Sequence, residues 1–399
     1  MSNLENYMKQ QAIFCEQNDS ISKNLYSEYG VKRGLRDEKG QGVLTGLTNI
    51  SDIKAFEYRD GVKSPCDGEL SYRGYNIKDL VTGSKGKRFV FEEGAYLLLF
   101  GELPTDTQLM EFQGRLSDCM ELPTNFTRDV IMKAPTSDIM GSMTRSILTL
   151  GSYDKEKESL EIPNVLRQSM QLIAVFPMLA VYAYHAYCHY EKNESMYIHR
   201  PEKDLSIAEN FLRLLRPDTK FTELEARVLD IALLLHMEHG GGNNSTFTTR
   251  VVTSSGSDTY SVISAAMSSL KGKKHGGANL MVMNMMDDIK SHVKDYEDEE
   301  EIASYLSKIL KKEAFDQKGL IYGMGHAVYS ISDPRERVFK GFVEQLARDK
   351  GREKDMTLYN NIEKIAPKLI AKQRQIFKGV SPNICLLYTS PSPRDPKTS

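Results

Sequence analysis

The sequence carries almost no net charge and few cysteines, and both shortages exclude classes of protein. Its formal net charge is −2, so it lacks the basic field that non-specific nucleic-acid binding usually needs. Its five cysteines are scattered and show no CxxC spacing, which disfavours a disulfide framework and a structural zinc site. We therefore expect a protein of a reducing, intracellular compartment that does not bind nucleic acid.

The sequence also lacks targeting and membrane signals. Its first 32 residues contain several acidic side chains and no arginine, so they resemble neither an Arg-rich transit peptide nor a secretory signal with an apolar run. The most apolar stretch, residues 172–184, is interrupted by Pro177 and falls short of the roughly 20 apolar residues of a membrane span. These features predict a cytoplasmic protein with no membrane segment, in which this stretch is a core helix.

Helical periodicity extends over most of the chain. Apolar residues recur at the i, i+3, i+4 and i+7 spacing of a buried helix face, for example within residues 91–104 and 224–236. Thr222 and Glu225 form a capping-box pattern at the start of the second of these segments. Alternating patterns typical of strands are confined to short pieces near residues 54–59 and 69–72. The sequence predicts an all-α fold with no more than a small sheet.

The common local motifs of catalysis are missing, and histidines in glycine-rich segments remain as candidates. There is no Walker P-loop, GxSxG elbow or HExxH motif. In the first segment, residues 235–250, His236 and His239 end an apolar helix and three glycines follow. The glycines would let a ligand approach the backbone, whereas the plainer interpretation is that both histidines cap the helix C-terminus. A zinc site here would have no third ligand at a usual spacing.

The second segment, residues 273–289, has a histidine and two glycines at the start of a Met-rich apolar helix. The positive end of the helix dipole disfavours an imidazolium and keeps the ring of His275 neutral. A neutral imidazole can donate a hydrogen bond to a carbonyl oxygen, as the polarisation of a thioester before enolisation requires. The alternative is a plain helix cap.

The third segment, residues 319–338, holds a glycine-flanked turn, His326 and the sequence Asp333-Pro334-Arg335. The turn can cradle a flat ligand through main-chain groups, and the planar fork of Arg335 suits a carboxylate. Taken alone, the last three residues are better interpreted as a surface turn whose charges pair with each other or with neighbours.

Together, the three segments closely resemble the citrate synthase family. The patterns HxxH with STF and a later arginine, HGGAN, and GMGHxVY followed by DPR occur in the order found in that family, and residues 69–80 and 91–105 extend the match. The resemblance covers about residues 46–383. It implies an all-α, two-domain helical fold with a large domain over residues 1–276 and a small domain over residues 277–384, the active site lying between them.

The resemblance also assigns roles to individual residues. In the family, oxaloacetate is held by side chains that match His239, His326 and Arg335, and His326 also stabilises charge that develops on the ketone oxygen. The acid that polarises the acetyl-CoA carbonyl matches His275. No metal and no organic cofactor takes part. The residues that match the coenzyme A site are Leu320, Ile321, Gly323, Met324, Gly325 and Lys378.

The C-terminus departs from the family pattern. The general base of the family is an aspartate in a segment like PNVDFYSG, and Cys385 stands at that position here. Two later arginines and the final helices of the large domain are also missing. Residues 385–399 lose all periodicity and are rich in Pro, Ser and Thr, so we interpret them as a non-native tail on a chain that is C-terminally truncated.

The leading functional hypothesis is a citrate synthase. It is an acyltransferase that condenses acetyl-CoA with oxaloacetate and water to citrate and CoA, the entry step of the tricarboxylic acid cycle, and works as a homodimer or larger homo-oligomer. One alternative is a 2-methylcitrate synthase that uses propionyl-CoA, because the sequence does not reveal the pocket size. Another is that this chain, without the aspartate, is an inactive fragment that serves in binding or assembly. A third, a metal-dependent hydrolase, would use His236, Glu238 and His239 or the pair His185 and His189.

Overall fold

The computed structural model describes residues 3–18, 22–32, 35, 46–82, 89–272, 275–326, 328–374 and 379–389. The chain forms two compact units, Met1–Leu47 and Thr48–Ser399. The described residues of the first unit include the helices α1 (Asn3–Asn18) and α2 (Lys23–Glu28). All the predicted site residues belong to the second unit.

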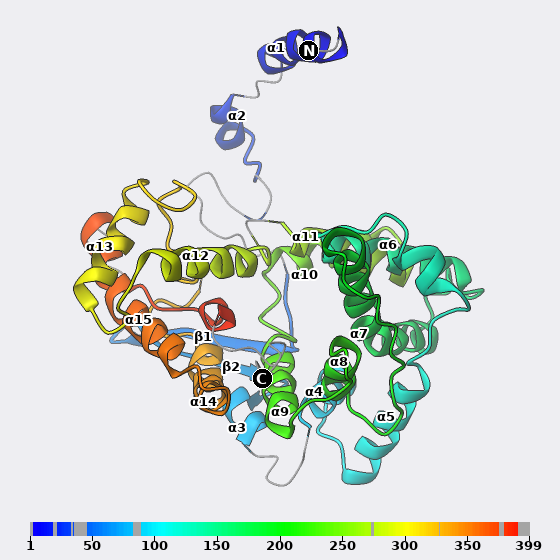
Figure 1. Ribbon diagram of the computed structural model, residues 1–399. Coiled ribbons are helices and arrows are strands. Elements are labelled where there is room, and N and C mark those ends of the chain that lie inside the picture. Colours follow the sequence, from blue (N-terminus) through cyan, green and yellow to red (C-terminus); the bar gives the residue numbers. More distant parts are fainter. Residues whose placement is uncertain are drawn as a thin grey trace. The chain divides into compact units, whose positions relative to one another are not determined.

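The second unit is mostly helical, which confirms the predicted all-α class (Figure 1). Two short elements of other helix types, the π-helix η1 (Thr127–Ile131) and the 3₁₀-helix η2 (Ile384–Thr389), accompany the α-helices. The α-helices are α3 (Ile77–Thr82), α4 (Phe91–Phe100), α5 (Asp106–Asp118), α6 (Ile139–Tyr153), α7 (Ile162–Lys192), α8 (Ile207–Leu215), α9 (Glu223–Leu235), α10 (Asn244–Ser254), α11 (Thr259–Leu270), α12 (Ala278–His292), α13 (Glu299–Leu310), α14 (Pro334–Asp349) and α15 (Glu353–Arg374).

A small antiparallel sheet opens the second unit. Its strands are β1 (Ser51–Arg59), β2 (Val62–Tyr72) and β3 (Tyr75–Asn76), in the order β1-β2-β3. Both long strands extend beyond the short pieces that alternation predicted. The reason is that burial alternates along both strands but residue type does not follow it, because Phe56, Tyr58 and Val62 are exposed while Glu57 and Ser64 are half-buried.

The helix α7 contains the apolar stretch that was predicted to be a core helix. Its 31 residues are long and apolar enough to cross a membrane by length and composition, and half of the most apolar window is buried inside the protein. Leu172, Val175 and Leu179 belong to a buried hydrophobic cluster with residues of α6 and α11. This packing confirms the core position. The helix continues through Pro177 and is longer than the predicted stretch.

The helices α9 and α14 pack against each other and position the candidate site (Figure 1). The predicted capping box begins α9, because the Glu225 N–H donates to Thr222 Oγ1 at 3.2 Å and the Thr222 N–H donates to Glu225 Oε2 at 2.9 Å. At the far end of α14, Lys350 Nζ pairs with Glu225 Oε1 at 2.7 Å. The two helices are therefore antiparallel, and the C-terminus of α9 lies near the N-terminus of α14.

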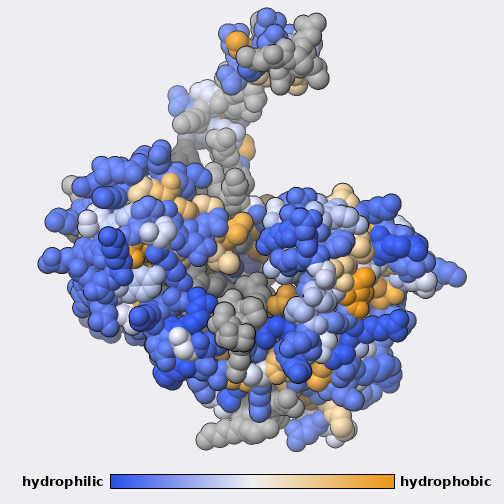
Figure 2. Space-filling model, viewed as in Figure 1, coloured by the Kyte–Doolittle hydropathy of each residue, from blue (hydrophilic) through white to orange (hydrophobic). Residues whose placement is uncertain are grey.

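The largest hydrophobic cluster draws on β2, α4, α9, α12 to α15 and η2. Leu386 and Leu387, from the segment interpreted as a tail, are 0% and 2% exposed in this cluster. The domain boundary at residue 276 and the non-native origin of residues 385–399 stay predictions. On the outside, Figure 2 shows mostly hydrophilic residues with scattered hydrophobic groups on the face it displays.

Candidate active site

Three aromatic rings from two loops meet beside the ends of α9 and α14. The ring centroids of His239 and His326 lie 5.0 Å apart, with the ring planes at 76°. Tyr329 contacts both rings, with centroid distances of 5.4 Å to His239 and 4.9 Å to His326. The structure therefore brings together two of the histidines that the sequence singled out. Tyr329, which received no role from the sequence, completes the group.

The hydrogen bonds of His326 fix its tautomer. Its Nδ1 accepts the backbone N–H groups of Val328 at 3.0 Å and Tyr329 at 3.2 Å, so this nitrogen carries no proton. Burial lowers the pKa of His326 to about 4, which keeps the ring neutral near pH 7. The single ring proton is consequently on Nε2, where it is available to a ligand.

His236 and His239 differ sharply although they lie three residues apart. The Nδ1 of His236 is 2.6 Å from the carbonyl oxygen of Ala232, one helical turn earlier, so this ring caps its own helix as the plainer interpretation proposed. His239 makes no such bond: its Nε2 is buried and has no hydrogen-bond partner among the described residues. Burial, followed by the charge of Arg335, lowers the pKa of His239 to about 3. An unpaired buried ring nitrogen is costly, and a ligand atom would satisfy it.

Arg335 is buried and is held by its neighbour. Its Nε and Nη2 donate to the two carboxylate oxygens of Asp333 at 3.1 and 2.9 Å, and the arginine is only 8% exposed. Although burial opposes ionisation, the charge and hydrogen bonds of Arg335 hold the pKa of Asp333 below its ordinary value. The pairing predicted for a surface turn is present, but the turn is buried. The guanidinium lies close enough to His239 and His326 to disfavour a positive charge on either ring.

His275 lies apart from this group. It precedes α12, whose N-cap residue Gly277 makes no side-chain cap, and its Nε2 is 2.8 Å from Ser245 Oγ in the first turn of α10. Burial lowers the pKa of His275, in the direction that favours a neutral ring. Within the described residues, no hydrogen bond or ring contact joins His275 to the other three predicted residues. Sequence reasoning gave no role to its partner Ser245, although Ser245 stands in the first of the glycine-rich segments.

The predicted coenzyme A loop bonds to a later segment of the chain. The carbonyl oxygen of Gly323 accepts the N–H of Asn383 at 2.9 Å, and the N–H of Gly325 donates to the carbonyl oxygen of Ser381 at 2.7 Å. The Asn383 side chain also donates to the carbonyl oxygen of Gly325 at 2.7 Å. Several main-chain groups expected to face coenzyme A are therefore already paired.

The backbone conformation explains why this loop contains glycines. Gly323 and Gly325 have φ angles of +82° and +84°, in the left-handed region that favours glycine. Between them Met324 forms a bridge with Pro382, while Ile321 is buried and Leu320 is 38% exposed. Lys378 lies outside the described residues.

The thiol of Cys385 lies close enough to Asp333 and Arg335 for their charges to influence its pKa. Its backbone N–H donates to Asn383 Oδ1 at 3.0 Å. The preceding N–H in the chain, that of Ile384, donates to Asp333 Oδ2 at 3.2 Å. Burial raises the pKa of the Cys385 thiol to about 11, so the thiol keeps its proton near neutral pH. The residue that departs from the family pattern thus stands beside the Asp333 and Arg335 pair.

The residues proposed for a metal site are engaged elsewhere. The Nε2 of His185 is 3.0 Å from the carbonyl oxygen of Leu214, and the Nδ1 of His189 is 2.8 Å from that of Glu194. Glu238 accepts a hydrogen bond from Ser51 at 3.1 Å. Among the residues that the structure describes, no group of three or more His, Cys, Asp or Glu side chains is placed to hold a metal ion.

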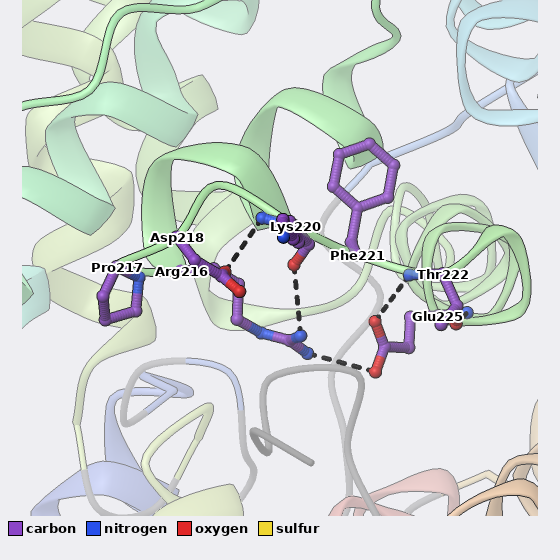
Figure 3. A pocket seen from close by; sticks show the side chains of 7 residues that line it. All are labelled: Arg216, Pro217, Asp218, Lys220, Phe221, Thr222 and Glu225. Carbon is purple, nitrogen blue, oxygen red and sulfur yellow. Dashed lines mark hydrogen bonds and ion pairs between the residues drawn. The ribbon is translucent and has the colours of Figure 1, made fainter.

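A pocket of about 530 Å³ lies at the start of α9 (Figure 3), whereas His236 and His239 follow the end of that helix. Arg216 Nη2 pairs with Glu225 Oε1 at 3.3 Å across it, and the guanidinium also reaches the carbonyl oxygen of Lys220 at 3.4 Å. None of the predicted site residues lines this pocket. The lining residues are Arg216, Pro217, Asp218, Lys220, Phe221, Thr222 and Glu225.

Comparison with known proteins agrees with the fold and with the motifs. The sequence model described as "Citrate synthase, C-terminal domain" matches residues 37–389. The chain is 33% identical over 309 residues to the 2-methylcitrate synthase of Shewanella oneidensis, a match that covers 77% of this chain and 74% of that protein. It is 32% identical over 345 residues to the citrate synthase of Synechocystis sp., covering 85% of this chain and 77% of that protein.

A solved structure of a citrate synthase has a similar fold. The crystal structure of citrate synthase from Pyrobaculum aerophilum superposes with a TM-score of 0.70 at 26% sequence identity, covering 90% of this chain and 84% of that one. The family match over residues 37–389 includes the segments that carry His239, His275, His326 and Arg335. The chain belongs to the citrate synthase family.

Proposed function

We propose that this protein is a condensing acyltransferase that joins the acetyl group of acetyl-CoA to oxaloacetate and then hydrolyses the resulting thioester with water, which releases coenzyme A and citrate. The observation that carries this proposal is the meeting of His239, His326 and Arg335, two neutral rings and one cation, around a buried ring nitrogen without a partner among the described residues. Oxaloacetate is a small dianion with a ketone, and it needs such a combination of charge and hydrogen-bond donors.

In the proposed complex, each residue acts on a different part of oxaloacetate. The Nε2–H of His326, fixed by the two backbone bonds to Nδ1, donates to the ketone oxygen and stabilises the negative charge that develops there during attack. Arg335 holds a carboxylate, and the Nε2 of His239 binds a second polar group of the substrate. Both rings are neutral near pH 7, so His326 acts on the ketone oxygen as a hydrogen-bond donor and not as a cation.

His275 is the proposed acid for the thioester. Its lowered pKa favours a neutral imidazole, which donates to the carbonyl oxygen of acetyl-CoA as the methyl proton leaves. Ser245 Oγ, 2.8 Å from Nε2, orients the ring. The acetyl-CoA would bind near the loop that contains Leu320, Ile321, Gly323, Met324 and Gly325.

The step that this chain performs poorly is removal of the methyl proton. The general base must be ionised near neutral pH, and a thiol with a pKa of about 11 holds its proton there. We therefore propose that the chain with Cys385 binds oxaloacetate and releases almost no thiol from acetyl-CoA. The same proposal includes the wider role as the entry step of the tricarboxylic acid cycle, carried out in the cytoplasm by a homodimer without a cofactor. Light scattering of the purified protein tests whether it is a dimer.

Isothermal titration with oxaloacetate tests the proposed site directly. The parent chain is expected to bind, and Arg335→Lys is expected to weaken binding by at least about tenfold, because lysine keeps the charge and loses the planar fork. Arg348→Lys, on the exposed face of the same helix, is the matched control and should bind as the parent does. Equal affinities for all three proteins would refute the carboxylate assignment.

A second candidate is 2-methylcitrate synthesis from propionyl-CoA. The relative from Shewanella oneidensis carries that name at 33% identity, close to the 32% of the citrate synthase from Synechocystis sp.. The reaction is the same apart from one methylene group on the thioester. A steady-state comparison of the two thioesters, made with the Cys385→Asp variant, decides between the two functions. A higher kcat/KM for propionyl-CoA than for acetyl-CoA would identify the protein as a 2-methylcitrate synthase in place of a citrate synthase.

A further inference from the structure

We propose that the hairpin of β1 and β2 is a positioning element for the oxaloacetate-binding residues, and that Gly68 is the point where it fixes the loop carrying His326. The inference rests on the proposed function, because it explains how the substrate-binding groups are held. His239 and His326 belong to loops far apart in the sequence, so a centroid distance of 5.0 Å requires a structural element that holds both loops in place. The hairpin touches both.

The contact with the His326 loop is made by β2. The Gly68 N–H donates to Ser332 Oγ at 3.1 Å, and this hydroxyl donates in turn to Asp67 Oδ1 at 2.9 Å. Tyr329, whose ring lies against both histidines, donates through its hydroxyl to the carbonyl oxygen of Glu69 at 3.4 Å. Ser332 is 4% exposed and Tyr329 is 1% exposed. The histidine loop is therefore bonded to three consecutive residues of one strand.

The approach at Gly68 is too close for any side chain. A Cβ added there would lie 2.3 Å from the carbonyl oxygen of Ser332 and 2.6 Å from Cδ1 of Tyr329. The first of these is a backbone atom, so the loop would have to move as a whole. Glycine at this position thus sets how closely the loop that carries His326 and Arg335 approaches the sheet.

The contact with the His239 loop is made beside the first, toward the open end of the hairpin, where Ile53 pairs with Leu70 and Ser51 with Tyr72. Tyr72, fully buried, donates through its hydroxyl to the carbonyl oxygen of Leu234 at 2.9 Å. Ser51, which pairs with Tyr72 across the two strands, donates to Glu238 Oε1 at 3.1 Å. A Cβ on Gly240 would lie 2.6 Å from Cδ1 of Ile53 on β1. The residues before and after His239 therefore rest on the same hairpin.

The two contacts are separable, which allows each histidine to be tested alone. Ser332→Ala removes the hydroxyl that joins Gly68 to the His326 loop, whereas Tyr72→Phe removes the bond to Leu234 before His239. Gly68→Ala introduces the backbone clash. Gly114→Ala, in α5 with no atom within 4 Å of an added Cβ, is the matched control for a glycine substitution.

Two readouts on the full chain test the proposal. The first is histidine ring nitrogen NMR without ligand, assigned with His239→Gln and His326→Gln, and the second is oxaloacetate affinity by titration. Ser332→Ala is expected to shift mainly the His326 signals and Tyr72→Phe mainly those of His239. Gly68→Ala is expected to shift the His326 signals and to weaken oxaloacetate binding by at least about tenfold, while Gly114→Ala changes neither.

The outcomes separate this proposal from the proposed function. If Ser332→Ala and Tyr72→Phe lower the melting temperature but leave the ring signals of both histidines unchanged, the hairpin is only structural and the positioning role is refuted. The positioning role is also refuted if folded Gly68→Ala binds oxaloacetate as the parent does. If the parent itself does not bind oxaloacetate, the proposed function fails, and the unliganded ring signals still decide whether the hairpin positions the histidines. Should Gly68→Ala not fold, the two hydroxyl variants give the answer.

Discussion

Hydrogen bonds at Nδ1 decide which ring nitrogen of His236 and of His326 carries the proton. The carbonyl oxygen of Ala232 can only accept, so His236 donates from Nδ1, whereas His326 accepts two N–H groups at the same atom and is protonated at Nε2. Burial keeps both rings neutral, since it lowers each pKa to about 4. The two rings therefore differ for a local reason: His236 bonds to its own helix, and His326 keeps its proton on Nε2, the atom proposed to meet the ligand.

At this scale, the role of His275 can be tested by substitution in a chain that carries the Cys385→Asp change. His275→Ala is expected to lower kcat by a factor on the order of a hundred or more with little change in oxaloacetate affinity, because an acid acts on the reacting thioester and not on oxaloacetate. Steady-state kinetics and oxaloacetate titration measure the two quantities. His189→Ala, at an exposed ring bonded to a backbone carbonyl, is the control. A mild effect of His275→Ala would remove His275 from the mechanism.

Pairs of elements carry the site to its position. The helices α9 and α14 lie antiparallel, with the residues proposed to bind oxaloacetate at one end and a buried ion cluster at the other. In that cluster, Glu225 pairs with Lys350 and with Arg216, and the side chains of Glu225 and Lys350 are 1% and 4% exposed. Charged groups that are so deeply buried destabilise the fold unless charged partners compensate for the lost hydration.

Lys350→Met is therefore expected to lower the free energy of unfolding by about 3 kcal/mol, since it leaves Glu225 buried with one fewer counter-charge. Urea denaturation measures the change. Lys364→Met is the matched control, because Lys364 and Glu299 form an ion pair about half exposed, and such pairs contribute about 0.5 kcal/mol. Equal losses for both variants would show that the buried cluster does not tie α9 to α14.

Helix termini are also tied together by buried carboxylates. Asp230 of α9 accepts the N–H groups of Val90 and Phe91 at the start of α4, at 2.6 and 3.1 Å. Glu92 of α4 accepts the N–H of Ile207 at the start of α8, at 2.9 Å. Burial, followed by the charge of Glu92, raises the pKa of Asp230 to about 8, and burial also raises the pKa of Glu92.

This arrangement predicts a pH dependence of stability. An unfolded aspartate titrates near about 3.9, so folded Asp230 holds its proton more tightly than the unfolded chain does. Its contribution to stability is complete at low pH and is lost as the pH rises to about 8, the folded pKa. Asp230→Asn should reduce the fall in unfolding free energy between about pH 6 and about pH 9. Urea denaturation at the two pH values measures it, and an identical fall in both proteins would contradict the assignment.

At the scale of the whole molecule, the periodicity of the sequence predicted the helices well, but it did not predict which distant residues contact each other. The all-α class and the start of α9 at Thr222 followed from helix spacing and capping, because these signals lie within a few residues. The hairpin was predicted only as short pieces, and its contacts with both histidine loops had no signal, since Gly68 and Ser332 lie far apart in the chain. The grouping of His239, His326 and Arg335 came from the family resemblance and not from spacing.

Family membership leaves the choice of thioester open at this scale. Relatives of nearly equal identity are named as citrate and as 2-methylcitrate synthases, so whole-chain similarity does not separate substrates that differ by one methylene group. Discrimination of that size depends on a few side chains in the acyl pocket. The thiol of Cys385 beside Arg335, by contrast, is expected to slow the condensation of either thioester.

The release of coenzyme A thiol from acetyl-CoA in the presence of oxaloacetate, compared between the parent chain and Cys385→Asp, tests the proposed chemistry most directly. We expect almost no release by the parent, because the thiol at residue 385 keeps its proton, and a gain of at least about tenfold for the aspartate variant. Fast turnover by the parent, or an aspartate variant that binds oxaloacetate and gains nothing, would contradict the roles proposed for residue 385 and its neighbours.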